Sequence, residues 1–308
     1  MTEAKAGAKT ILCAGGAVQD LVMRVEAFPA PGAKVQASDV VTTVGGQAGN
    51  AAVALAHLGA RVRYAGPIGA ADDAVASFVQ AELEREGVDC RGAVRVPGGT
   101  SSLSLILVDA AGERTVTTRR GSNLNGVAPR DADALVQACD AVLLDNRYPD
   151  FTTPVAMAAK ARNLPRVLDF DRAAPADDPL LLASTHVIAS ADALRESTGT
   201  PDLAAALRAL ARRYKGFLAV TSGPGGVTWR EGDGVRHMPA FKVDAIDTLG
   251  AGDTFHGAFA LRVAETNDAV VALRFACAVA AIKCTRFGGA KGAPTRQEVE
   301  DFLAQRAR

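Results

Sequence analysis

Short apolar runs alternate with longer amphipathic segments along most of the chain. Two of the amphipathic segments, which have helical spacing, end at Gly59 and Gly87, where a left-handed helix cap suits glycine. Six apolar runs have the length and composition of buried strands: 10–15, 61–66, 141–145, 166–170, 186–190 and 217–221. Strands that alternate with helices predict a doubly wound α/β fold with a mainly parallel central sheet.

Two segments do not follow this alternation of strands and helices. Residues 21–44 predict two strands around a Pro/Gly turn, and residues 102–120 predict a hairpin with a glycine turn. In the hairpin, three leucines alternate with residues of the opposite face, as in a half-buried antiparallel sheet: Leu103, Leu105 and Leu107. We expect these two insertions to form a small β-sheet lid that excludes water from a site in a single domain, 1–308.

The composition of the chain limits the kinds of partner that we expect it to bind. The chain has 308 residues, of which 48% are hydrophobic, so it can bury a large core. Because 34 basic residues balance 34 acidic ones, we expect no nucleic-acid or membrane partner but a small molecule. The longest apolar stretch near the C-terminus, 270–282, is too short for a bilayer span, and the N-terminus lacks a signal-peptide core. These features predict a cytoplasmic protein.

The strongest local motif is DTLGAGD at 247–253, which precedes an apolar helical pattern. Small residues at this position leave backbone N–H groups open, and the helix dipole adds partial positive charge: Gly250, Ala251 and Gly252. Asp253 would lie in the first helical turn, where it could accept the proton of an attacking hydroxyl beside a transferring phosphoryl group. The alternative is an ordinary glycine loop with a capping aspartate.

Two further glycine-rich segments follow predicted strands. In GGQAGN at 45–50, Gly45 and Gly46 let the backbone approach a ligand, and Asn50 can bind hydroxyl groups such as those of a sugar. The segment 221–226 contains residues that permit a nucleotide to lie against the main chain: Thr221, Gly223, Gly225 and Gly226. Either segment could instead be a structural turn, the second one leading into a hairpin.

Several motifs are absent from the sequence. There is no Walker A lysine, no GxGxxG dinucleotide fingerprint and no GxSxG elbow. The five cysteines show no CxxC spacing, and the four histidines are scattered, so neither zinc nor disulfides are expected. The chemistry is therefore expected to rest on the three glycine-rich segments.

Together, the segments GGQAGNAAVALAHLGA and DTLGAGDTFHGAFA resemble the two signatures of the ribokinase-like (PfkB) carbohydrate kinases, in the same order and separation. The resemblance covers nearly the whole chain. It implies a three-layer α/β/α fold with a β-lid that often mediates homodimerisation. It also implies a sugar kinase that uses ATP with Mg²⁺.

The resemblance assigns roles to matching positions. The sugar would be faced by Asp20, Gly45, Gly46 and Asn50, and the anion hole and base would be formed by Gly250, Ala251, Gly252 and Asp253. Thr221 and Gly223 would line the nucleotide site, and Cys277 stands where many members contact the purine. Asp247 would belong to a monovalent-cation site, for which K⁺ is the expected ion.

One family motif is missing. Many members carry Asn-x-x-Glu, which helps to place Mg²⁺ and phosphate, whereas the equivalent segment 190–193 reads SADA. Asp169 and Asp171, at the end of the strand 166–170, are alternative outer ligands of Mg²⁺.

Within the family, the DTLGAGDTF motif, the strand end Asp145-Asn146-Arg147 and the helix FACAVAAIKC look most like the ketohexokinase and sulfofructose kinase branch. This favours a ketose or a sugar with an acidic tail. Arg147 could bind an oxyanion on the substrate, with help from Arg119 and Arg120, although these two also suit a solvated surface. The alternatives are a nucleoside kinase, which the few aromatic residues of the lid disfavour, and a regulator that binds without turnover.

Overall fold

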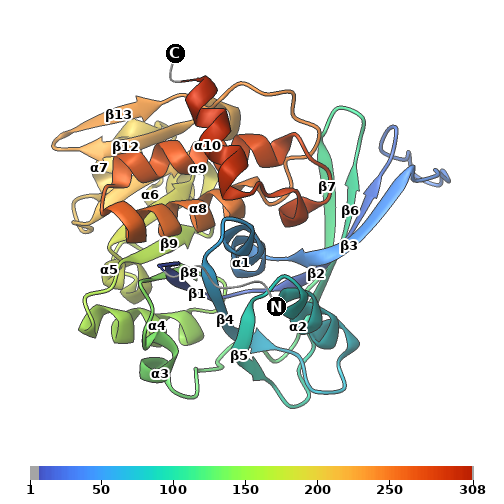
Figure 1. Cartoon of the computed structure of the whole chain (residues 1–308), viewed down its shortest axis with the longest axis horizontal. Coiled ribbons are helices and arrows are strands. Elements are labelled where there is room, and N and C mark those ends of the chain that lie inside the picture. Colours follow the sequence, from blue (N-terminus) through green and yellow to red (C-terminus); the bar gives the residue numbers. More distant parts are fainter. Residues whose placement is uncertain (1–6, 307–308) are drawn as a thin grey trace.

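The computed structural model describes residues 7–306 and contains a large and a small β-sheet (Figure 1). The strand order of the large sheet is β13-β12-β11-β10-β9-β8-β1-β4-β5. Its strands are β1 (Thr10–Ala14), β4 (Arg61–Ile68), β5 (Asp89–Arg95), β8 (Ala141–Asp145), β9 (Arg166–Phe170), β10 (His186–Ser190), β11 (Phe217–Thr221), β12 (Val227–Glu231) and β13 (Gly234–Met238). All six runs predicted as strands are confirmed.

All neighbouring strands from β5 at one edge of this sheet across to β11 run parallel. At the other edge, β12 and β13 add an antiparallel hairpin. The central strands are fully buried along their length, as expected for a parallel sheet covered on both faces. Because the strands are parallel, their carboxyl ends meet at one edge. Every glycine-rich motif of the sequence analysis begins at or near a strand end or helix start.

Helices cover both faces of the large sheet. One face carries α1 (Gln47–His57), α2 (Ala74–Arg85), α8 (Ala251–Thr266), α9 (Ala269–Cys284) and α10 (Arg296–Gln305). The other carries α3 (Ala132–Val136), α4 (Pro149–Ala161), α5 (Pro179–Ala183), α6 (Ala191–Thr198) and α7 (Leu203–Leu210). Each layer encloses its own apolar core, so the predicted doubly wound α/β architecture, with three layers, is confirmed. Gly59 and Gly87 have the expected positive φ.

The two departing segments form the small sheet, in the order β3-β2-β6-β7, which projects from one side of the molecule (Figure 1). Its strands are β2 (Val18–Arg24), β3 (Asp39–Gly45), β6 (Ser102–Val108) and β7 (Arg114–Arg119). The two outer pairs are antiparallel, but the central pair, β2 and β6, is parallel. This central pair joins the two insertions.

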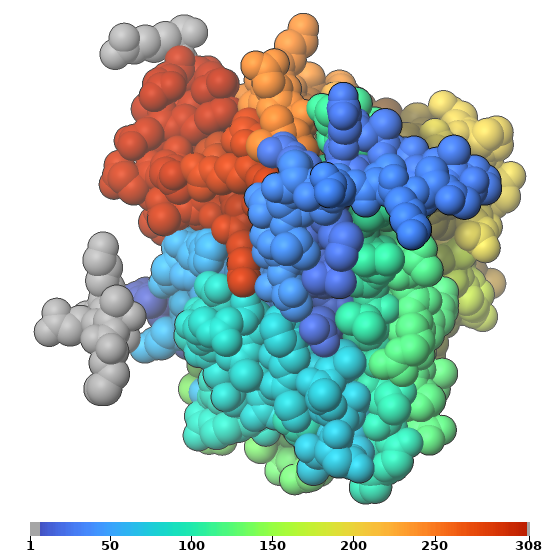
Figure 2. All heavy atoms as spheres, turned by 90° about the vertical axis from the view of Figure 1, so that its right-hand side faces the viewer, coloured from blue at the N-terminus to red at the C-terminus, as the bar shows by residue number. Residues whose placement is uncertain are grey.

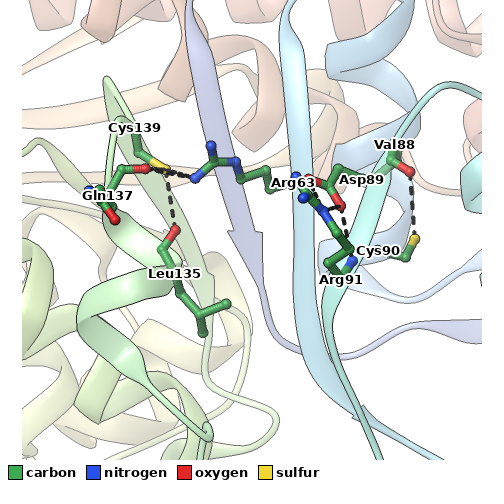
Figure 3. Close-up of polar contacts among 8 residues, drawn as sticks. All are labelled: Arg63, Val88, Asp89, Cys90, Arg91, Leu135, Gln137 and Cys139. Carbon is green, nitrogen blue, oxygen red and sulfur yellow. Dashed lines mark hydrogen bonds and ion pairs between the residues drawn. The ribbon is translucent and has the colours of Figure 1, made fainter.

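The cysteines are free thiols, as the sequence predicts. Cys139 lies 3.8 Å from Nη1 of Arg63, and Cys90 donates to the carbonyl oxygen of Val88 (Figure 3). Burial raises the pKa of the Cys90 thiol to about 12, so this thiol is protonated and unreactive at neutral pH. Among residues 7–306, no helix is long and apolar enough to cross a membrane.

Candidate active site

The N-terminus of α8 presents open backbone amides. Its N-cap is Gly250, which has a φ of 71° and no side chain to cap the helix. The first helical hydrogen bond runs from the amide of Thr254 to the carbonyl of Gly250. Within residues 7–306, the amides of Gly252 and Asp253 have no hydrogen-bond acceptor. A 16-residue helix with free N–H groups at its start favours an anion there.

A direct contact joins the two signature motifs. The side-chain amide of Asn50, on α1, donates a 2.6 Å hydrogen bond to Oδ2 of Asp253, across 203 residues of sequence. A Cβ at Gly250 would approach the Asn50 amide to 3.2 Å, so the glycine allows this close packing. The contact fixes one carboxylate oxygen of Asp253 and leaves the other available.

The electrostatics of Asp253 suit a proton acceptor. Burial raises the pKa of this carboxyl to about 6, the Asn50 hydrogen bond opposes the shift, and the charges of Asp171 and Asp145 add to it. A carboxylate with this pKa is ionised at neutral pH but is more basic than a solvated one. Asp253 can therefore accept a proton from a hydroxyl group that lies against it.

Asp20 lies on the inner face of the small sheet. It is only 5% exposed and is paired in register with Ser104 of β6. Burial raises the pKa of Asp20 to about 7, which the Ser104 hydroxyl opposes and the charge of Asp253 reinforces. A Cβ at Gly45 would overlap the Asp20 carboxylate, so only glycine fits at that position. Gly46 has a φ of 79° and packs against Gly16.

The carboxyl ends of β1, β8 and β9 complete this region. Asp145, the last residue of β8, accepts hydrogen bonds from the amides of Gly16 (2.7 Å) and Arg147 (2.9 Å). The stem of Arg147 passes over Gly16, where an added Cβ would lie 3.2 Å from Cγ of the arginine. The predicted sugar-facing residues thus gather around the Gly15–Gly16 turn and the small sheet.

Asp169, at the end of β9, is one of the two aspartates proposed as outer Mg²⁺ ligands. Burial and then the charges of Asp253, Asp171 and Asp145 raise its pKa well above the usual range. Nδ1 of His256 lies 2.7 Å from the carbonyl oxygen of Gly252 and 3.4 Å from Oδ2 of Asp169. The sequence shows only that the histidines are scattered, so it did not identify this link between β9 and the first turn of α8.

The residues present fit a nucleotide-borne Mg²⁺ better than a resident metal. Carboxylates are the side chains that Mg²⁺ uses, typically one or two of them with water and phosphate oxygens. Among the described residues, no group of three or more histidine, cysteine or acidic side chains could hold a metal ion. The mutual repulsion of Asp169, Asp171 and Asp253 nevertheless makes the site receptive to a divalent cation that arrives with phosphate groups.

The structure gives Asp247 a different partner from the expected K⁺. Its carboxylate accepts hydrogen bonds from the amides of Leu249, Gly288 and Gly289. The ammonium of Lys283 lies 2.8 Å from its carbonyl oxygen and 3.2 Å from Oδ2, with both side chains fully buried. A lysine ammonium therefore contacts the Asp247 carboxylate, and the role of Asp247 at a monovalent cation stays a prediction.

The residues predicted to line the nucleotide site lie further along the carboxyl edge of the large sheet. Thr221 ends β11, next to Ser190 of β10, and Gly223–Gly225 forms a short 3-10 turn. Nothing lies within 4 Å of a Cβ placed at Gly223, so its outer side is open to a ligand. Gly226 has a φ of 87° and packs against the backbone of β13, which gives it a structural reason to be glycine.

Cys277, the candidate purine contact, is buried on α9 within the core beneath the large sheet. Burial raises the pKa of its thiol to about 12, so it is neutral and apolar in character. Its role at a purine remains a prediction.

Sequence reasoning missed the part that Arg114 plays. This arginine begins β7 on the inner face of the small sheet, and its Nη1 donates a 2.6 Å hydrogen bond to Oγ1 of Thr248. It also lowers the pKa of Asp253 by its charge. Arg119, by contrast, donates to the carbonyl oxygen of Ser101 and is tied to the base of the hairpin.

A surface hollow of about 1270 Å³ lies at the opposite, amino edge of the large sheet and contains none of these residues. The basic side chains that line it already have partners: Lys9 pairs with Asp140 and Arg296 with Glu265. The arrangement of charged groups, and not the size of this hollow, marks the carboxyl edge as the candidate active site.

Similarity to known proteins identifies the family of the chain. The model of the pfkB family of carbohydrate kinases matches residues 8–296. The chain is 32% identical to a ribokinase of Bacillus subtilis, over 96% of this chain and 100% of the relative. It is also 32% identical to an ATP-dependent ribose-1-phosphate kinase of Halopiger xanaduensis, over 96% and 98% of the two chains.

Solved structures show the same fold. A presumed ribokinase from Agrobacterium tumefaciens superposes with a TM-score of 0.92 at 37% identity, over 98% of this chain and 100% of that chain. The ribokinase of Arabidopsis thaliana, solved with ribose and ATP, superposes with a TM-score of 0.80 at 24% identity, over 97% and 99%. These relatives are not ketohexokinases, so the expected placement in the ketohexokinase and sulfofructose kinase branch is not supported. The chain belongs to the pfkB family of carbohydrate kinases, within which it is a ribokinase-like, ATP-dependent phosphotransferase that acts on an alcohol group.

Proposed function

We propose that this kinase phosphorylates ribose or a similar sugar, with Asp253 as the general base. The observation that carries the proposal is the Asn50–Asp253 contact at the open N-terminus of α8, which places a basic carboxylate beside free backbone amides. The ribokinase relatives, which match almost the whole chain, favour ribose over the ketose suggested by local motifs.

In this mechanism the sugar lies between Asp20 and Asn50, and the hydroxyl that reacts lies against Asp253. Asp253 accepts the hydroxyl proton as the oxygen bonds to the γ-phosphorus of ATP, and the bond from that phosphorus to the bridging oxygen of ADP breaks. The open amides of Gly252 and Asp253 bind the transferred phosphoryl group. Mg²⁺, when bound with ATP, would be held near Asp169 and Asp171 and would neutralise phosphate charge.

The test is ADP formation from Mg-ATP over a panel of pentoses, hexoses, ketoses and nucleosides. We expect turnover with a pentose, and a fall in kcat of about 10³-fold or more in Asp253→Asn. The matched control is Asp244→Asn, which changes an exposed aspartate that precedes the same loop. Near-normal turnover by Asp253→Asn would refute the base, and a preference for nucleosides would favour the nucleoside-kinase alternative.

The small sheet is proposed to act as a lid and as the contact between two copies of the chain. Its inner face carries Asp20 and Arg114, whereas its outer face carries Leu105 (43% exposed) and Val40 (55% exposed). Exposed apolar residues on the outer face of a projecting sheet favour a homodimer through this face. Figure 2 faces the side from which the small sheet projects, and the blue atoms of its N-terminal part lie across the front of the molecule. The free thiols support a cytoplasmic location.

A further inference from the structure

Three arginines lie together at the sugar end of the carboxyl edge. Arg147 follows β8 and Arg172 follows β9, each two residues beyond the strand end. The two strands are adjacent and parallel, with Asp145 paired in register with Asp169. The side-chain amide of Asn146 donates a 2.6 Å hydrogen bond from Nδ2 to the carbonyl oxygen of Arg172, which ties the two strand-end loops to each other.

The small sheet brings Arg120 to the same place. Arg120 directly follows β7, whose last residue, Arg119, pairs with Leu103 at the start of β6. The preceding residue, Ser102, is the first of β6 and pairs with Val18, the first residue of β2, two positions beyond Gly16. The amide of Gly121 also donates a 2.9 Å hydrogen bond to Oγ of Ser102. The end of β7 therefore lies beside the Gly16 turn that the Arg147 stem covers.

The charges of this cluster are not balanced by the protein. In the described part of the chain, none of the three guanidinium groups is within 4.0 Å of a carboxylate oxygen, whereas Arg85, Arg286 and Arg296 all form ion pairs. Burial, followed by the charges of Arg147 and Arg120, lowers the pKa of Arg172. Asp145, whose charge raises the pKa of Arg172, already accepts hydrogen bonds from two backbone amides.

A helix end adds to the positive charge. Arg147 immediately precedes Tyr148, the N-cap of α4, which caps this 13-residue helix with no side-chain hydrogen bond. The Arg147 guanidinium lies 5.4 Å from the centre of the Tyr148 ring, which holds it over the helix start. The one acid of the first turn, Asp150, accepts a hydrogen bond from the amide of Gly126. An anion at this point would meet both the guanidinium groups and the positive end of the helix.

We propose that the acceptor sugar carries an oxyanion group, and that Arg120, Arg147 and Arg172 bind it at the end of the substrate remote from Asp253. This inference rests on the sugar-kinase function proposed above. Planar guanidinium groups pair well with phosphate, sulfonate and carboxylate oxygens. A neutral sugar would leave three like charges close together without compensation.

The experiment compares kcat/KM for matched neutral and anionic acceptors, for example ribose against ribose 1-phosphate, ribose 5-phosphate and a sugar acid. We expect one anionic sugar to be preferred over its neutral counterpart by about 100-fold, since charge-assisted contacts of this kind each contribute about tenfold. Arg147→Gln and Arg172→Gln should each reduce this preference by about 10-fold or more, mainly through KM. Arg162→Gln, at the far end of α4, is the matched control and should leave it unchanged.

Two results separate the possible failures. Efficient phosphorylation of neutral ribose, with no gain from an anionic group and no change of preference in the arginine variants, would overturn the anion subsite and leave the kinase function intact. Absence of turnover with every sugar, neutral and anionic, would overturn the proposed function and this inference with it.

A second, independent observation concerns Lys283 at the end of α9. Its ammonium is fully buried and contacts both the carbonyl oxygen and the carboxylate of Asp247, at the start of the loop that ends in Asp253. The adjacent Cys284 carbonyl accepts the amides of Ile246 and Asp247, which anchors the same loop to α9. A buried carbonyl and carboxylate form a site that requires a cation.

We infer that Lys283 is a positioning residue that supplies this cation from the protein itself, so that the loop is ordered for phosphoryl transfer without a dissolved monovalent ion. Turnover should then change by less than about twofold between a potassium buffer and one containing only a large organic cation. Lys283→Met should lose about 10-fold or more in kcat and regain part of it when K⁺ is added. Lys215→Met, an exposed lysine, is the control.

The circular-dichroism spectrum and nucleotide affinity of Lys283→Met would establish that the variant is folded. A wild-type enzyme that needs K⁺ for activity would refute the inference. A folded Lys283→Met that is fully active without K⁺ would refute it as well.

Discussion

At the scale of single residues, the site is governed by buried and half-buried carboxyl groups whose charges are only partly compensated. Asp253 and Asp20 have pKa values raised to about 6 and about 7, in both cases chiefly by burial. Their environments differ, because an amide of Asn50 binds Asp253, whereas Asp20 lies on the small sheet opposite Ser104. The raised values have separate consequences for catalysis and for stability.

For catalysis, Asp253 must be deprotonated to accept a proton. With a pKa of about 6, kcat/KM should rise by about tenfold per pH unit below that value and level off above it. A pH profile of ADP formation at low sugar concentration would measure this limb. A profile that is flat between about pH 5 and 8 would contradict the assignment of Asp253 as the base.

The direction in which folding stability changes with pH follows from the pKa of Asp20. Because the folded value of about 7 exceeds the unfolded value, the folded state binds the extra proton, and stability falls as the pH rises through this window. Asp20→Asn removes the buried charge and should stabilise the fold at pH 8 by on the order of 2 kcal/mol, with much less effect at pH 5. Urea unfolding at both pH values would test this; an equal effect at both would contradict it. Sugar affinity should fall.

At the scale of elements, the two faces of the small sheet have opposite characters. The sequence shows the alternation of Leu103, Leu105 and Leu107, but the structure buries the other face, which carries Ser102, Ser104, Ile106 and Val108. The buried face is the one that meets the α1 and α8 motifs. The polar residues of β6 are therefore buried because they face the site, and the leucines lie on the outer side.

Arg114 gives β7 a role beyond covering the site. Its hydrogen bond to Thr248 links the small sheet to the loop whose amides would bind the phosphoryl group. Arg114→Met should lower kcat by about 10-fold while changing the KM for sugar less, because a charge that stabilises the transferred phosphoryl is lost. Steady-state kinetics would measure the two effects separately. Thr115→Val, an exposed neighbour on β7, is the control; equal losses in both variants would indicate a general disturbance of the strand.

At the scale of the whole molecule, strand order places the chemical groups in sequence along one edge. Gly16 and Arg147 lie at β1 and β8, Asp169 at β9, and Thr221 at β11. The proposed sugar end, phosphoryl site and nucleotide segment are thus consecutive. Since α8 packs above the middle of this order, Asp253 lies between the proposed sugar and nucleotide regions.

The proposed dimer is also a property of the whole molecule. Leu105→Glu on the outer face of the small sheet should shift the chain towards monomer in sedimentation velocity, because it places charge in an apolar contact. Met157→Glu, on α4, replaces a residue that is 52% exposed on another surface and should leave assembly unchanged. A wild-type chain that sediments as a monomer would refute the proposed dimer.

The sequence by itself determined the six parallel strands, because strands buried on both faces must be continuously apolar. It also determined the GGQAGN and DTLGAGD turns, since positive φ at Gly46 and Gly250 and close packing at Gly45 need glycine locally. Only the tertiary structure decided which distant groups meet. The Asn50–Asp253 contact, the Lys283 ammonium on Asp247 and the gathering of Arg120 with Arg172 depend on strand order and helix packing, which no local pattern encodes.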